Sequence, residues 1–228
     1  MSLPQTPFTL IFDMDGVIVD SNPYHKQAWT LFCQGVKNTI TNEEMQTHIF
    51  GKTNEDALTY LYGDTLSPEQ IMQLAREKEV LYRQLFHPHI KAPNGLTDFL
   101  KQCNHHGVYP SIATSAPPDN VDFVLDSLQL RSYFSLIVDE TMVKKGKPDP
   151  EIYLLTAQKL GIAPSNCVVF EDSLSGTVAA RSAGMNVIGV TTTHTRQELA
   201  PYVDACIDDF AWLAQNLLRI EELLKQPV

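Results

Sequence analysis

Residues 9–17 read TLIFDMDGV, a short and almost wholly apolar run that ends in two aspartates. The run Thr9–Phe12 is typical of a strand buried on both faces of a parallel sheet. Asp13 and Asp15 follow it directly, separated by one residue. Ligand sites of doubly wound sheets lie at the carboxyl ends of their strands. This stretch therefore predicts both a central strand and a pair of acids at the functional edge of the sheet.

Further apolar runs of strand length follow, with amphipathic helical segments between them. They are Pro110–Ala113, Leu136–Val138, Val168–Phe170, Val187–Val190 and Ala205–Ile207. Alternation of buried strands with helices is the pattern of α/β folds. We expect a Rossmann-like, doubly wound parallel sheet.

One stretch breaks this alternation. Between Asn22 and Ala92 the sequence shows only helical periodicity, in segments near 23–36, 43–48, 54–61 and 68–87. An all-helical insert after the first strand is the simplest interpretation. We therefore predict a catalytic core made of residues 1–21 and 92–228, and a helical domain made of residues 22–91.

The composition narrows the classes of function. The 228 residues carry a formal net charge of −10 and no basic run, which argues against nucleic-acid binding. No apolar stretch approaches the roughly 20 residues that span a bilayer, and residues 1–7 lack the features of a secretory signal. The four cysteines are scattered without metal-type spacing, as expected of buried thiols in a reducing cytoplasm. We expect a cytoplasmic monomer that binds neither nucleic acid nor membrane.

Acidic residues end two of the predicted strands. A carboxylate such as Asp13 can attack phosphorus, and a second one, such as Asp15, can carry the proton of the leaving or incoming oxygen. Glu171 and Asp172 follow another strand, where acids are costly unless they are paired or bind a metal, and oxygen ligands suit Mg²⁺. Taken singly, the first pair is also typical of a turn, and the second of a helix N-cap, a role that Ser173 can fill instead.

Two further motifs carry groups suited to phosphate. Thr114 and Ser115 follow a strand and offer hydroxyl and backbone N–H donors, although they would serve equally to cap the next helix. Lys147 precedes a proline-capped helix, where a cation can offset charge between carboxylates and a phosphate. A solvated basic loop is the alternative, and it suits Lys144 and Lys145 better. The coincidence of four such motifs at strand ends favours a single phosphate-binding site.

Together the four motifs resemble those of the haloacid dehalogenase superfamily, and they are spread over nearly the whole chain. The helical insert resembles the α-helical cap of that superfamily, whose closure would exclude water and select the substrate. The resemblance implies that Thr114, with Ser115 beside it, binds phosphate, and that Lys147 balances charge.

The resemblance also assigns roles to the acids. It implies that Asp13 is the nucleophile and that Asp15, two residues on, is the general acid and base. The implied Mg²⁺ ligands are Asp13, the backbone carbonyl of Asp15, and Asp172, with Glu171 also at the metal. Dehalogenases and phosphonate-cleaving members of the superfamily lack the second aspartate, so Asp15 favours phosphate esters.

A closer resemblance is to β-phosphoglucomutase and the related sugar-phosphate phosphatases. It rests on residues 13–29 and, in the insert, on Gly51, Glu55, Asp56 and Lys78. His25 lies on an apolar helical face, so it is either a core residue or, as the resemblance implies, a group close to the acid/base. Lys78 interrupts an apolar stripe, so it is either a lysine that reaches solvent or a substrate-binding cation.

One candidate substrate-binding position departs from the mutases. They carry an arginine that grips the distal phosphate of the substrate, where this chain has Asn54. Loss of a charge-assisted contact weakens binding by roughly 10–150-fold unless Lys52 or His48 compensates. We therefore expect a Mg²⁺-dependent phosphohydrolase of a small phosphorylated metabolite, with a sugar phosphate favoured, and keep a bisphosphate-using mutase as the alternative. The intact acids disfavour a third reading, a non-catalytic binding module.

Overall fold

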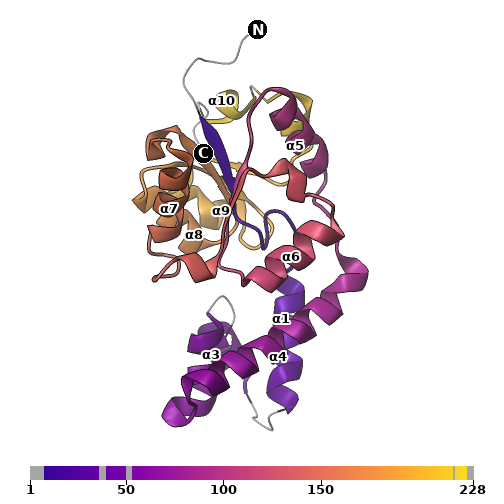
Figure 1. The fold of residues 1–228 in the computed structure, drawn as a ribbon, viewed down its shortest axis with the longest axis vertical. Helices are drawn as coiled ribbons and strands as arrows, with labels where there is room; N and C mark the ends of the chain where they lie inside the picture. Colours follow the sequence, from indigo (N-terminus) through magenta and orange to yellow (C-terminus); the bar gives the residue numbers. More distant parts are fainter. Residues whose placement is uncertain (1–7, 36–39, 50–52, 218, 225–228) are drawn as a thin grey trace. The chain divides into compact units, whose positions relative to one another are not determined.

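The computed structural model describes residues 8–35, 40–49, 53–217 and 219–224. Within these residues six strands form one parallel sheet in the order β3-β2-β1-β4-β5-β6 (Figure 1). They are β1 (Thr9–Phe12), β2 (Ser111–Ala113), β3 (Leu136–Val138), β4 (Cys167–Glu171), β5 (Asn186–Val190) and β6 (Ala205–Ile207). The predicted doubly wound α/β sheet is confirmed, and every predicted strand matches an observed one to within one residue at either end.

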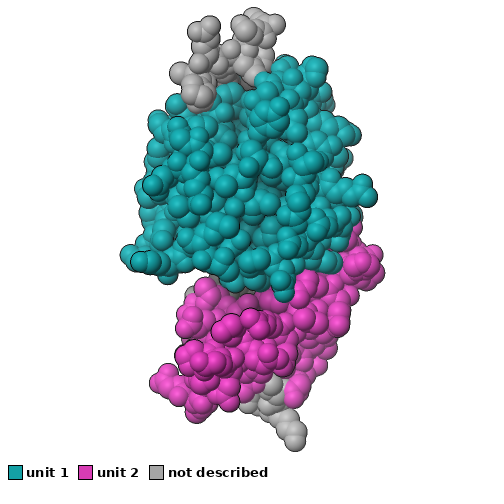
Figure 2. Space-filling view, viewed as in Figure 1, with its two compact units in different colours: residues 1–20, 91–228 teal, residues 21–90 magenta. Residues whose placement is uncertain are grey.

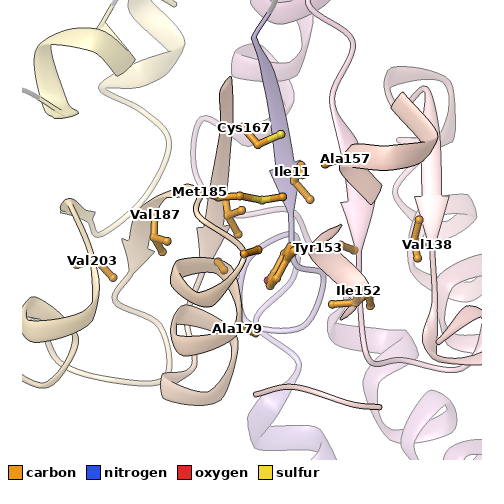
Figure 3. Close-up of a cluster of buried hydrophobic side chains, with 14 of the residues drawn as sticks. Ile11, Val138, Ile152, Tyr153, Ala157, Cys167, Ala179, Met185, Val187 and Val203 are labelled. Atoms are coloured by element: carbon orange, nitrogen blue, oxygen red, sulfur yellow. The ribbon is translucent and has the colours of Figure 1, made fainter. Parts of the chain in front are cut away.

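Helices cover both faces of this sheet. Ile11 of β1 packs with residues of α7 (Glu151–Leu160) and α8 (Leu174–Ser182) in the apolar cluster of Figure 3. The next residue, Phe12, points to the opposite face because side chains alternate along a strand. There it meets an aromatic cluster that includes Phe99 of α5 (Leu96–His105), Phe134, Phe170 and Phe210. With both faces packed, the strand ends are where polar groups can gather.

The remaining helices of this part are α6 (Pro118–Ser127), α9 (Arg196–Leu199) and α10 (Arg219–Leu224). None of the helices in the described part of the chain combines the length and apolar character needed to cross a bilayer. The four cysteines are buried and form no disulfide.

The chain divides into two compact units, residues 1–20 with 91–228 and residues 21–90, which Figure 2 colours separately. The second, the helical unit, has no strand among its described residues. It contains α1 (Asn22–Gly35), α2 (Asn42–Glu44), a π-helical turn (Met45–Ile49), α3 (Asn54–Tyr62) and α4 (Pro68–Phe86). A capping box between Ser67 and Gln70, with Pro68 in the first turn, begins α4. The unit has an apolar core of its own, made of Trp29, Cys33, Met45, Ile49, Ala57 and Leu58.

Candidate active site

The loop after β1 is a tight turn that closes on its own backbone. The amides of residues 17–19 lie 2.8–3.2 Å from the carbonyl oxygen of Met14 and donate to it. Gly16 has a φ of 79°, a conformation that a side chain would strain. The amide of Asp13 donates to the carbonyl of Phe170 at 3.0 Å, which extends the β1–β4 ladder by one residue. Asp13 is thus held on a rigid base at the end of the central strand.

Acids from two neighbouring strands meet one lysine here. Lys147 Nζ lies 3.0 Å from Asp13 Oδ1 and 2.7 Å from Glu171 Oε1, and its side chain is only 6% exposed. Asp172 is adjacent, and one carboxylate oxygen from each of the three acids lies within 4.8 Å of the others. The structure therefore brings Asp13, Glu171, Asp172 and Lys147 together, as the motifs predict.

Burial gives these acids unequal pKa values. Loss of hydration raises the pKa of Asp13 to about 7, although the charge of Lys147 opposes the shift. Burial, with the charges of Glu171 and Asp13, also raises the pKa of Asp172 well above its ordinary value. Burial acts in the same direction on Glu171, but Lys147 and several hydrogen bonds outweigh it, so the pKa of Glu171 is lowered. One lysine therefore does not offset the cost of ionising all three acids.

The arrangement fits a divalent cation. Although Lys147 Nζ is 3.0 Å from Asp13 Oδ1, the pair lacks the alignment of a hydrogen bond, and no other donor among the described residues reaches this buried oxygen. Three buried acids face this one lysine, and buried negative charge is costly unless a further cation balances it. Carboxylate oxygens on adjacent strands are also the ligands that Mg²⁺ prefers. Asp13 and Asp172 are therefore suited to hold such an ion.

The end of β2 reaches the same cluster. Its last residue, Ala113, places its carbonyl oxygen 3.4 Å from Lys147 Nζ. Thr114, the next residue, is 1% exposed, and its hydroxyl accepts from the amide of Ala116 at 3.1 Å. Ser115 is exposed. Asp15 contributes electrostatically, since its negative charge helps to raise the pKa of Asp13.

The helical unit holds a second buried lysine. Lys78 of α4 is 3% exposed and pairs with Glu79 at 2.7 Å. Asn54 donates its side-chain amide to the same Glu79 oxygen at 2.9 Å, and Lys78 Nζ lies 3.1 Å from His25 Nδ1. The ring of His25 stacks on Tyr82 with 3.7 Å between centroids. Three predicted residues, His25, Lys78 and Asn54, thus meet around Glu79.

Of the two residues that would compensate for the missing arginine, one lies among the described residues. Lys52 lies outside the described residues. His48 is exposed and stacks on Tyr60, with ring centroids 4.0 Å apart. Its role in substrate binding stays a prediction.

Two threonines of the site are absent from the sequence motifs. Thr192 and Thr193 lie just beyond β5. Thr192 donates its hydroxyl to the carbonyl of Gly16 at 2.5 Å, and Thr193 donates its hydroxyl to Asp172 Oδ2. Polar residues directly after a strand of a doubly wound sheet lie at its ligand-binding edge, so this position was the signal that could have found them.

Two helical residues were also missed. Tyr153 of α7 donates its hydroxyl to Glu171 Oε1 at 2.9 Å. A tyrosine on the buried face of a helix needs a partner for its hydroxyl, and this need is the sequence signal that could have identified Tyr153. Glu79 falls three residues before Tyr82 and seven before Phe86, so it lies on the buried face of α4 with them. An acid in that register is costly unless it has a partner nearby.

Comparisons with known proteins agree with this geometry. Residues 10–190 match the family model described as haloacid dehalogenase-like hydrolase. The chain is 36% identical over 187 residues to a fructose-1-phosphate phosphatase of Escherichia coli, covering 79% of this chain and 95% of that protein. It is 30% identical over 190 residues to β-phosphoglucomutase of Bacillus subtilis, covering 79% and 82%. A solved structure of a HAD hydrolase, family IA, variant 3, from Entamoeba histolytica superposes with a TM-score of 0.86 at 29% identity, covering 96% of this chain and 100% of that one. This protein is an enzyme and belongs to the haloacid dehalogenase-like hydrolase family.

Proposed function

We propose that the protein is a Mg²⁺-dependent phosphohydrolase of a small phosphorylated metabolite, in the first place a sugar phosphate, and that it works through an aspartyl-phosphate. The observation that carries the proposal is the buried Asp13 carboxylate, which lies against Lys147 and among further acids with one oxygen lacking a donor. A carboxylate held in this way is suited to act as a nucleophile.

The proposed chemistry has two steps. Asp13 attacks phosphorus, the ester P–O bond breaks, and Asp15 donates a proton to the leaving oxygen. Asp15 then takes a proton from water, which attacks the aspartyl-phosphate and releases phosphate. Lys147, with Thr114 and Ser115, holds the phosphoryl oxygens.

The metal has a defined place in this proposal. When bound, Mg²⁺ would offset the negative charge of the phosphoryl group and the acids. Asp13, the backbone carbonyl of Asp15, and Asp172 would hold it, with Glu171 close by. Asp13 must be ionised to attack. Burial raises its pKa to about 7 even though Lys147 lowers it, so without the charge of Lys147 still less of Asp13 would be ionised at neutral pH.

The helical unit supports hydrolysis over phosphoryl transfer between sugars. We propose that this unit is the cap and that His25, Lys78 and Asn54 take part in selecting the substrate. Glu79 already pairs with Lys78 and accepts from Asn54, so the lysine is compensated within the unit. A second phosphate on the substrate would meet the carboxylate of Glu79 beside Lys78. A monophosphate fits this charge balance better than a bisphosphate does, and the name of the Escherichia coli relative gives a monophosphate, fructose 1-phosphate, as its substrate.

A single assay tests the proposal. The enzyme is incubated with Mg²⁺ and either fructose 1-phosphate or β-glucose 1-phosphate, with and without a trace of glucose 1,6-bisphosphate. Free phosphate and glucose 6-phosphate are both followed, with EDTA as the metal-free control. Free phosphate that requires Mg²⁺ is the expected result. If glucose 6-phosphate forms and its formation requires the bisphosphate, the enzyme is a mutase and not a hydrolase. Similarity to the Bacillus subtilis protein also favours that function. If neither product forms, both of these sugar phosphates are excluded as substrates.

A further inference from the structure

The carboxylate of Glu171 has no free hydrogen-bonding capacity. Its Oε1 accepts from Lys147 Nζ at 2.7 Å and from the Tyr153 hydroxyl at 2.9 Å. Its Oε2 accepts from the amide of Ser173 at 2.9 Å and from the Ser173 hydroxyl at 3.0 Å. An ionised carboxylate has about four acceptor positions, so these donors fill them.

The backbone of α8 also fixes this carboxylate. A Cβ atom added at Gly176 would lie only 1.6 Å from Glu171 Oε1. Glu171 therefore lies directly against the first turn of α8, in space that only a glycine leaves open. Because Glu171 itself is 0% exposed, water does not replace any donor that is lost.

Lys147 depends on this anchor. An ammonium group has three N–H donors. The neighbours of Lys147 Nζ are Glu171 Oε1 at 2.7 Å, Asp13 Oδ1 at 3.0 Å and the carbonyl of Ala113 at 3.4 Å. The ammonium also lies 5.0 Å from the ring centroid of Tyr153. Tyr153 thus contacts the lysine with its ring and shares with it one oxygen of Glu171.

Tyr153 stands at the polar edge of an otherwise apolar cluster. It is fully buried between α7 and the sheet, among residues such as Ile11 and Ile152 (Figure 3). Its hydroxyl is the one polar atom of its side chain, and it points to Glu171 rather than to helix backbone. Phenylalanine would fill the same apolar space, so the hydroxyl has a task that packing does not explain.

We propose that Tyr153 is a positioning residue, whose hydroxyl locks Glu171 and whose ring flanks Lys147, so that the ammonium stays on Asp13. Glu171 in turn acts through Lys147 and not as a direct ligand of the metal. This inference rests on the proposed function, because Asp13 is taken as the nucleophile.

The test compares two variants of α7 that each lose one buried hydroxyl. Tyr153→Phe removes the donor to Glu171. Thr156→Val removes a hydroxyl that is also 0% exposed but donates to the carbonyl of Ile152 in the same helix. For phosphate release from fructose 1-phosphate, we expect Tyr153→Phe to lower kcat by about tenfold or more. KM and the Mg²⁺ concentration for half-maximal rate should stay within about twofold, and Thr156→Val should keep kcat at a similar melting temperature.

A second measurement does not depend on turnover. In ¹⁵N-labelled protein the ammonium signal of Lys147, assigned by its loss in Lys147→Met, should exchange slowly with water. Tyr153→Phe should speed that exchange by about tenfold or more, and Thr156→Val should not. A wild-type protein that releases phosphate from no sugar phosphate would refute the proposed function, while the exchange rates would still decide the role of Tyr153. Three results would overturn the inference. The first is an unchanged exchange rate in Tyr153→Phe, and the second is a loss of kcat in Thr156→Val equal to that in Tyr153→Phe. The third is a higher Mg²⁺ concentration for half-maximal rate in Tyr153→Phe.

Discussion

Each unit of the molecule buries a lysine against carboxylate, yet the charge around the two lysines differs. Lys147 contacts Asp13 and Glu171, with Asp172 close by, so three acids surround one cation. Among the described residues Lys78 pairs with one acid, Glu79, which also accepts from the neutral side chain of Asn54. A buried excess of charge is costly unless another ion balances it.

The difference separates two kinds of polar cluster. The Lys147 cluster has more acids than cations among the described residues, which is consistent with the proposed binding of a metal ion and a phosphoryl group. The Lys78 cluster is balanced by itself, so it suits recognition of a neutral, hydroxyl-rich part of a substrate. The predictions below test this contrast.

The largest effect is expected from Asp13→Asn. The change keeps the shape of the side chain and removes the proposed nucleophile, so kcat for phosphate release should fall by at least about 10⁴-fold. The metal-free protein should melt no lower than wild type, because a neutral amide replaces a carboxylate whose pKa burial raises to about 7. Kinetics and thermal unfolding check the two parts. Turnover within about a hundredfold of wild type would exclude Asp13 as the nucleophile.

Replacing each lysine by methionine compares the clusters directly. Lys147→Met should lower kcat by on the order of 10²–10³, because it removes a donor aimed at the reacting phosphoryl group. Lys78→Met should instead raise KM and leave kcat within about tenfold, because it removes a binding contact. Steady-state kinetics with the same sugar phosphate separate the two. Equal losses of kcat would mean that Lys78 also serves the chemical step.

The sheet and its acids could be predicted because their signals are local. The run Thr9–Phe12 is apolar throughout, and the acids come directly after it. Parallel strands end at one edge, so four motifs far apart in the chain had to meet there. The meeting of Asp13 with Glu171 and Asp172 follows from that rule.

Partners joined across elements could not be predicted in the same way. Glu79 pairs with its neighbour Lys78, but its bond to Asn54 spans 25 positions. Tyr153 and Glu171 are 18 positions apart on a helix and a strand. Such pairs depend on the angle and rotation at which two elements pack, which periodicity does not encode. A residue type shows that a partner is needed, and only the structure shows which one.

Three consecutive threonines allow a matched test of the metal site. Thr193 donates to Asp172, whereas Thr191 donates to Asp208, outside the acidic cluster. Thr193→Val should weaken Mg²⁺ binding by about 10–100-fold, because partners that orient a metal ligand contribute that much. Thr193→Ser should restore it, and Thr191→Val should leave it unchanged. Binding is measured by calorimetry without substrate. Equal affinities in the two valine variants would remove Thr193 from this role.

The smallest effect is expected in the helical unit, from Glu79→Gln. The amide keeps an oxygen for Asn54 and Lys78 but removes the charge that compensates the lysine. A second phosphate would then meet an unpaired cation, so glucose 1,6-bisphosphate should inhibit about tenfold more strongly. Inhibition by inorganic phosphate, which we expect to bind at the Lys147 cluster, should not change. Glu77→Gln is the control, since Glu77 is an exposed acid on the same helix. If both variants tighten inhibition equally, the effect reflects the net charge of the helix, and the balance around Lys78 does not set the preference for a monophosphate.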